Sequence, residues 1–194
     1  MSTMEQVKAL REKTGGGIVE VKKALDEANG DEAKAIEILK KRGEAKALKK
    51  TGRTAAEGIV VSYIHSNKRV GTLLTLLCET DFVGRNEEFQ ELAHDLAMHV
   101  TAMAPGYIHP EDVPAETVAS ERTLWEEQVA AEGKPAAIAL KILAGKEKKF
   151  REEQALLTQP FVKDSTKTVQ TLITEKIHRI GENIQIGRFT RFEI

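Results

Sequence analysis

The sequence contains few of the residues that most often announce a function. Its 194 residues include one cysteine, five prolines and nine aromatic residues, and the formal net charge is −1. No stretch approaches the ~20 consecutive apolar residues of a membrane span. The near-zero charge excludes a general attraction for nucleic acid or anionic lipid, so any charge argument must be local. With 41% hydrophobic and 30% charged residues, the composition is that of a soluble globular protein.

The only cysteine, Cys78, excludes an intramolecular disulfide. It lies in the apolar run 73–78, which favours a packed thiol in a reducing compartment. The first residues include no apolar stretch that could serve as a signal peptide. We therefore expect a cytoplasmic protein that binds no membrane.

Motifs of catalysis and metal binding are also missing. There is no C-x-x-C or H-E-x-x-H motif, no G-x-S-x-G motif, and the histidines lack the spacing of metal ligands. Gly15-Gly16-Gly17 has neither the frame nor the preceding strand of a phosphate-binding loop, so a turn between helices explains it better. The sequence predicts no catalytic residue, no metal site and no cofactor.

Residues 1–42 form a distinct compositional unit, because the first aromatic residue is Tyr63. Ser2, three residues before Glu5, predicts the start of a helix, and Asp31 is a suitable cap for a later one. A helix between them is predicted by four apolar residues at helical spacing: Ile18, Val21, Leu25 and Ala28. These patterns predict a small three-helix bundle.

Residues 43–57 are predicted to form a basic linker. Between residues 40 and 53 there are seven lysines and arginines and one glutamate, a local charge of +6. This stretch raises the alternative of an RNA-binding protein. Such a protein would need aromatic residues nearby on which bases can stack, and none precedes Tyr63.

Residues 58–194 are predicted to form an α+β core. The β-rich runs 59–65 and 70–79, joined by residues 66–69, indicate a hairpin, and a strand at 183–192 must pair with it to make a small antiparallel sheet. Flanking helices are predicted at four places: 87–103, 116–131, 136–143 and 166–179.

The segment 79–88 is unusual, because a buried strand leads into a polar loop that carries Phe82. Asn86 is a good N-cap for the following helix. Two interpretations are open at this point. Phe82 either folds back as a local hydrophobic plug, the usual fate of a phenylalanine, or projects into a partner.

Four segments resemble a known family. They read T-D-F-V-G-R-N at 80–86, L-R-E-K-T-G-G-G-I-V-E-V-K-K-A-L at 10–25, Q-P-F-V at 159–162 and I-G-E-N-I-Q-I at 180–186. In the order in which they occur along the chain, they resemble the segments of bacterial elongation factor Ts, the nucleotide-exchange factor of elongation factor Tu. Ile18-Val19 replaces the family's Met-Met, and Gly84 replaces its usual alanine.

The resemblance implies a ubiquitin-associated-like domain at 1–42, a linker at 43–57 and a dimerisation core at 58–194. It implies the short form of the family, hence a homodimer. Thr190 stands where some short members carry a dimer-linking cysteine. The implied partner is elongation factor Tu, with GDP-bound and nucleotide-free forms as targets and no direct contact with nucleic acid. The implied activity is release of GDP without covalent chemistry.

The resemblance also implies which residues contact the partner. The inserted loop is Thr80, Asp81, Phe82 and Val83. Contacts from the N-terminal domain and linker are Arg11, Ile18, Val19, Lys22 and Lys50. Contacts from the core are His65, Ile180 and Gly181. Two alternatives stay open: Ile18 as a helix-core residue, and Lys22 and Lys50 as ordinary surface charges.

Overall fold

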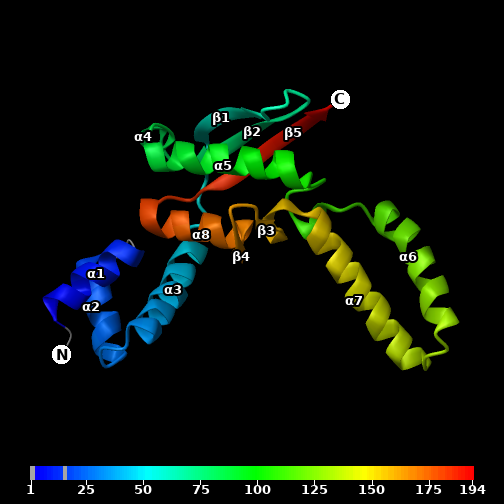
Figure 1. Ribbon diagram of the computed structural model, residues 1–194, viewed down its shortest axis with the longest axis horizontal. Coiled ribbons are helices and arrows are strands. Elements are labelled where there is room, and N and C mark those ends of the chain that lie inside the picture. Colours follow the sequence, from blue (N-terminus) through cyan, green and yellow to red (C-terminus); the bar gives the residue numbers. More distant parts are fainter. Residues whose placement is uncertain (1–2, 15–16) are drawn as a thin grey trace. The chain divides into compact units, whose positions relative to one another are not determined.

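The described part of the chain combines runs of helices with a small sheet whose strands come from distant parts of the sequence, which confirms the α+β fold (Figure 1). The computed structural model describes residues 3–14 and 17–194. It divides into two compact units. Unit 1 comprises Met1–Ile59, Leu77–Gln90 and Ile173–Gln185, and unit 2 comprises Val60–Leu76, Glu91–Leu172 and Ile186–Ile194. In the described part of the chain, no helix combines the length and apolarity needed to cross a membrane.

The predicted three-helix bundle is confirmed in unit 1 (Figure 1). Helices α1 (Met4–Thr14), α2 (Ile18–Glu27) and α3 (Glu32–Leu48) surround a core that contains Leu10 and Leu25, both fully buried. Asp31 caps α3 by accepting from the Lys34 N–H at 3.1 Å, as expected. Ser2 lies outside the described residues, and the cap of α1 is Thr3, whose hydroxyl accepts from the Gln6 N–H at 3.3 Å.

Helix α3 extends further than the bundle requires, and its second half packs on α8 (Val169–Ile180). A Cβ on Gly43 would lie 3.2 Å from the His178 ring, so a glycine lets the two helices approach closely. The predicted boundary at residue 42 therefore falls inside a continuous helix. The division into 1–42, 43–57 and 58–194 stays a prediction.

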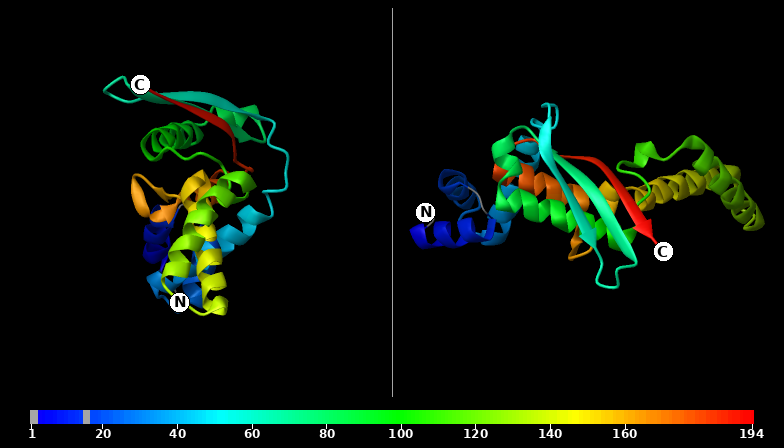
Figure 2. Two further views of the ribbon diagram at one scale, coloured as in Figure 1. Left: turned by 90° about the vertical axis from the view of Figure 1, so that its right-hand side faces the viewer. Right: turned by 90° about the horizontal axis from the view of Figure 1, so that it is seen from above.

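Three strands form the sheet, in the order β1 (Glu57–Ile64), β2 (Val70–Cys78), β5 (Gln185–Glu193), with β2 in the middle (Figure 2). In unit 2, the part of helix α5 (Glu87–Met103) from Glu91 onward covers one face, where Leu74, Leu76 and Leu96 are buried. Thr101 of α5 donates to the Thr72 hydroxyl of β2 at 2.8 Å. The opposite face carries exposed apolar side chains: Val60, Ile64, Leu73 and Phe192.

Helices α6 (Ala115–Ala131) and α7 (Ala136–Gln154) form a helical hairpin in unit 2 (Figure 1). Its small core contains Trp125 and Val129, and the Trp125 ring meets Phe150 edge-on at 5.6 Å. A short β3 (Pro160–Phe161) pairs antiparallel with β4 (Asp164–Thr168). The helix predicted at 166–179 therefore begins later, at Val169, because residues 164–168 are a strand.

His99 of α5 is fully buried and holds the Gln159–Val162 segment in place. Its Nδ1 accepts from the Val162 N–H at 3.2 Å, and its Nε2 lies 3.1 Å from Gln159 Oε1. These partners require a neutral imidazole with the proton on Nε2, because a protonated Nδ1 would face another donor. Burial accordingly lowers the pKa of His99.

We expect His99 to make the protein less stable in mild acid. Its folded pKa lies below the unfolded value of about 6.5, so the unfolded chain binds more protons as the pH falls below about 6.5. The contribution of His99 to the free energy of unfolding should stay constant above that pH and decrease below it, by up to about 1.4 kcal/mol per pH unit, until the folded pKa is reached. Urea unfolding between pH 7.5 and 5 measures this slope.

In His99→Gln the slope should decrease by one proton's contribution. The matched control is His94→Gln, which removes an exposed histidine from the same helix. An unchanged slope in His99→Gln contradicts the prediction.

Candidate functional site

The loop that follows β2 is the centre of the candidate site. β2 ends at Cys78, and after Glu79 and Thr80 the chain makes one helical turn, α4 (Asp81–Gly84). Asn86 then caps α5, its Oδ1 accepting from the Glu88 N–H at 2.8 Å. The loop therefore connects a buried strand to a capped helix, and its two ends are fixed in unit 1.

Glu182, which follows α8, anchors the start of this loop. One carboxylate oxygen accepts from the backbone N–H groups of Glu79 and Thr80 at 3.1 and 3.0 Å. The other accepts from the Thr80 hydroxyl at 2.7 Å. Hydrogen bonds to an ionised acceptor are about twice as strong as neutral ones, so three of them on one side chain make a firm anchor.

Asn183 continues the anchor. Its N–H donates to Glu79 Oε1 at 2.7 Å, and its side-chain amide donates to the Arg53 carbonyl at 2.7 Å. Arg53 also pairs with Glu79 at 3.4 Å. The fully buried Asn183 thus joins the linker, the end of β2 and the segment after α8 into one network.

Phe82 is 79% exposed on α4, so the plug interpretation is wrong for this chain. Asp81 beside it is also exposed and pairs with Arg85 at 2.9 Å. Val83 is half-buried, whereas Gly84 is buried against the backbone of Gly58. The loop therefore presents one large aromatic side chain and one carboxylate on a supported turn.

Cys78 lies directly under the loop and is buried, as its apolar neighbours predict. Its Sγ donates to the Thr80 carbonyl at 3.1 Å. Burial raises the pKa of the Cys78 thiol, and the nearby Glu182 carboxylate acts in the same direction. The thiol is thus a packed group and not an activated nucleophile.

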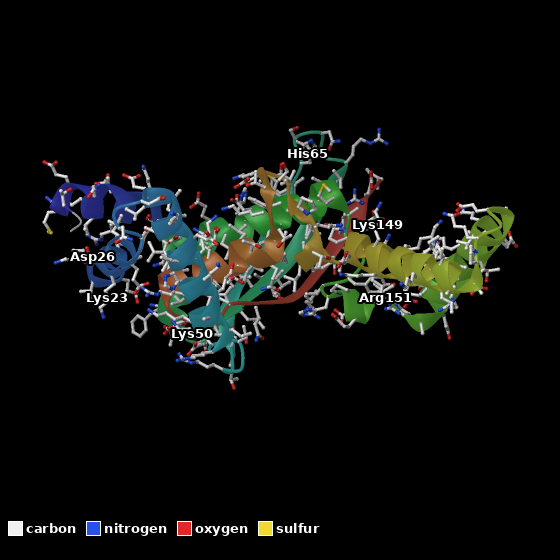
Figure 3. All side chains as sticks on the ribbon, turned by 90° about the horizontal axis from the view of Figure 1, so that it is seen from below. Lys23, Asp26, Lys50, His65, Lys149 and Arg151 are labelled. Atoms are coloured by element: carbon white, nitrogen blue, oxygen red, sulfur yellow. The ribbon has the colours of Figure 1, made fainter. Side chains whose placement is uncertain are left out.

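The structure brings Lys50 and Gly181 together. The Lys50 ammonium, labelled in Figure 3, donates to the Gly181 carbonyl at 2.6 Å. Gly181 has a φ of +94°, a conformation that favours glycine, and this turn separates the half-buried Ile180 from Glu182. Lys50, Ile180 and Gly181 therefore adjoin the loop anchor.

The candidate contacts on the bundle lie on the exposed sides of α1 and α2. Arg11 and Lys22 are exposed, as are Ile18 and Val19 at the start of α2. The alternative of Ile18 as a core residue is wrong, because the helix buries Val21 and its later neighbours instead. An exposed Ile-Val pair is an apolar surface available to a partner.

His65 belongs to unit 2 and lies where β1 turns into β2 (Figure 3). It is exposed, and its Nδ1 lies 3.3 Å from the Tyr63 hydroxyl. The turn is closed by a hydrogen bond from the Lys68 N–H to the His65 carbonyl at 2.8 Å. His65 is therefore displayed on a tight hairpin.

The basic stretch 40–53 is largely balanced within the chain. Most of its basic side chains have an intramolecular partner: Lys41 with Glu37, Arg42 with Glu27, Lys46 with Glu20, Lys50 with the Gly181 carbonyl and Arg53 with Glu79. The hydrogen bond from Lys46 lowers the pKa of Glu20, which favours its ionised form. Basic groups already paired have less to gain from phosphates, which weakens the RNA-binding alternative.

Two chemical features define what the site can do. Across residues 3–14 and 17–194, no group of three or more His, Cys, Asp or Glu side chains could hold a metal ion. What the loop offers instead is an exposed aromatic side chain on a turn fixed by buried hydrogen bonds. This arrangement is typical of a protein that acts by docking on another protein.

The comparisons with known proteins agree on one family. The chain matches the family described as elongation factor TS over residues 4–194. It is 51% identical over 194 residues to elongation factor Ts of Thermosipho melanesiensis, covering 100% of this chain and 99% of the relative. It is 54% identical over 193 residues to elongation factor Ts of Acetivibrio thermocellus, covering 100% and 90%. It is 52% identical over 192 residues to elongation factor Ts of Thermotoga maritima, covering 99% of this chain and 96% of the relative.

This similarity over the full length identifies the protein as a translation elongation factor of the nucleotide-exchange class. The chain belongs to the elongation factor Ts family.

Proposed function

We propose that the protein binds elongation factor Tu·GDP and accelerates the release of GDP, and that it stays bound until GTP is loaded. The observation that supports this most directly is the exposed Phe82 on a turn anchored by Glu182. In this proposal the protein is an exchange factor that makes and breaks no covalent bond. As a translation factor it acts in the cytoplasm.

In the proposed mechanism the Asp81-Phe82 turn enters the nucleotide-binding domain of elongation factor Tu. Phe82 supplies apolar volume that wedges between side chains and displaces the elements that hold Mg²⁺ and the β-phosphate. Asp81 supplies a carboxylate that accepts hydrogen bonds from the partner, for which it must leave Arg85. An exposed ion pair of this kind costs little to break. Thr80 and Val83 flank the pair and complete the inserted segment.

The thermodynamic requirement is differential binding. A protein that binds nucleotide-free elongation factor Tu more tightly than the GDP complex must weaken GDP binding by the same free energy. For ordinary allosteric pairs this coupling is about 1–3 kcal/mol. A side chain wedged into the phosphate site supplies such coupling, because the wedge and a closed Mg²⁺ and phosphate site cannot occupy the same space.

The other proposed contacts increase affinity. Contacts are proposed from Arg11 on α1 and from Ile18, Val19 and Lys22 on α2, all of which are exposed. Residues 1–42 are proposed to act as a ubiquitin-associated-like domain. Lys50, Ile180 and Gly181 adjoin the loop anchor. His65 is proposed to make a separate contact from the hairpin of the core domain, residues 58–194. Residues 43–57 connect the two.

We further propose that the protein is a homodimer. The exposed apolar residues of the sheet, Val60, Ile64, Leu73 and Phe192, all lie on the face opposite α5. Two such faces can stack as a two-layer sandwich, which removes their apolar side chains from water.

The activity is tested by measuring the release of fluorescently labelled GDP from elongation factor Tu in excess unlabelled GDP. The chain should accelerate release in a concentration-dependent, saturable manner. A binding titration with a labelled single-stranded RNA tests the RNA-binding alternative. Release unchanged by the protein, together with steeply salt-dependent RNA binding, would reverse the assignment.

A further inference from the structure

We propose that Glu182 is a positioning residue for nucleotide exchange, which holds the Asp81-Phe82 turn in the geometry that enters the partner. This inference rests on the proposed function and adds a residue that touches neither nucleotide nor partner to the same site. An exposed aromatic turn stays in one conformation only if contacts with the rest of the chain hold it there.

The turn cannot hold its own conformation. Helix α4 has four residues, far below the length at which an isolated helix is stable in water. Phe82 makes little contact with the rest of the chain, since it is 79% exposed. Thr80 at the N-cap position makes no side-chain hydrogen bond to the turn, because its hydroxyl donates to Glu182 instead. The conformation must therefore be imposed by contacts at the ends of the turn.

Glu182 supplies these contacts at the start of the turn. Its two oxygens accept from the N–H groups of Glu79 and Thr80 and from the Thr80 hydroxyl, which fixes the backbone two residues before Phe82. At the other end the Gln90 side chain donates to the Gly84 carbonyl at 3.3 Å. The direction in which Phe82 points is thus set by a carboxylate about 100 positions later in the sequence.

Glu182 is itself held rigidly. The preceding Gly181 carbonyl accepts from Lys50, and the N–H of the following Asn183 donates to Glu79. A side chain fixed on both flanks transmits its position to the groups it binds. Loss of the Glu182 carboxylate should therefore free the turn while Asn183 continues to join the end of β2 to the linker.

A positioning role separates two kinetic quantities. Contacts from the bundle and from His65 do not depend on Glu182, so the concentration that gives half-maximal exchange should change little. Correct insertion of Phe82 does depend on it, and small misplacements of a reacting group lower rates by factors of about 10 to 100. We expect Glu182→Ala to lower the maximal rate of GDP release about tenfold and to change the half-maximal concentration less than about twofold.

The matched control is Glu88→Ala. Glu88 lies in the same unit and pairs with Lys176 at 2.8 Å and Arg179 at 3.0 Å, but its carboxylate accepts no hydrogen bond from the turn. The two variants should lose similar stability, measured by thermal unfolding, and only Glu182→Ala should lose exchange rate. Amide hydrogen exchange adds a direct readout, because the N–H groups of Glu79 and Thr80 should lose protection in Glu182→Ala alone.

Glu182→Gln should restore most of the rate. Its amide oxygen can accept both backbone N–H groups, and its NH₂ group can donate to the Thr80 hydroxyl. Should Glu182→Ala fail to fold, Glu182→Asp withdraws the carboxylate by one methylene group without changing the inserted segment, and should give a partial loss of rate.

The inference is overturned if Glu182→Ala keeps the full maximal rate, or if Glu88→Ala loses as much. If the unaltered chain does not accelerate GDP release at all, the proposed function fails and the positioning role fails with it. The two failures are distinguished by the unaltered chain, which is measured first in the same assay.

Discussion

Replacing Phe82 with alanine should lower the maximal rate of GDP release from elongation factor Tu by roughly 10- to 100-fold. Burying a phenylalanine side chain gains about 1.5–3 kcal/mol relative to exposure, and each 1.4 kcal/mol corresponds to a factor of ten. In the free chain Phe82 is 79% exposed, so this free energy becomes available only in the complex. The substitution should therefore remove the wedge and leave folding stability nearly unchanged.

The measurement is a titration of elongation factor Tu carrying labelled GDP, with thermal unfolding of each variant run in parallel. Leu140→Ala is a suitable control, because Leu140 is an apolar residue of α7 that is 63% exposed and lies in unit 2. If losing any exposed apolar side chain lowers the exchange rate, both variants should be slower. If the wedge is what matters, only Phe82→Ala should be slower. Equal rates in Phe82→Ala and the unaltered chain would exclude Phe82 as the wedge.

Local patterns predicted most of the bundle and the sheet correctly. Asp31 was identifiable as a cap because a cap bonds to residues within its own first turn, three positions away. The strands on either side of the hairpin at 65–69 were identifiable for a similar reason, since neighbouring strands joined by a short turn carry their signal locally.

The incorrect predictions have specific physical causes. Ile18 continues the apolar spacing of α2, yet it is exposed, because it is the first residue of the helix and the buried side is formed by Val21, Ala24 and Leu25. The strand at 164–168 was missed because it is short and polar.

The loop anchor could not be predicted from sequence periodicity. Glu182 and Asn183 were noticed as part of a motif, but their partners Glu79 and Thr80 are about 100 positions away, and no local pattern encodes such a pairing. The exposure of Phe82 was likewise undecidable, because both the plug and the probe interpretations fit the same residues. Tertiary contacts alone separate them.

We also expect Phe192→Asp to convert a dimer into single chains. Phe192 lies on the open face of the sheet and is 64% exposed, beside Thr190 on the same strand. In a symmetric dimer each substitution acts twice, and burying an unpaired charge costs several kcal/mol. The dissociation constant should rise by roughly 100-fold or more. Light scattering over a range of concentrations should give twice the chain mass of 21.5 kDa for the unaltered protein and 21.5 kDa for the variant.

Leu140→Asp is the matched control, because Leu140 has almost the same exposure, 63%, but lies on the helical hairpin. It should remain dimeric, since the added charge stays in water. Thr190 can form no disulfide, so the association must be reversible and must weaken on dilution. A single-chain mass for the unaltered protein at every concentration would contradict the homodimer, and dimeric Phe192→Asp would place the interface elsewhere. Phe82 belongs to unit 1 and Phe192 to unit 2, so the substitution is expected to leave the Phe82 loop unchanged. The rate of GDP release with the monomeric variant therefore shows whether one loop suffices for exchange.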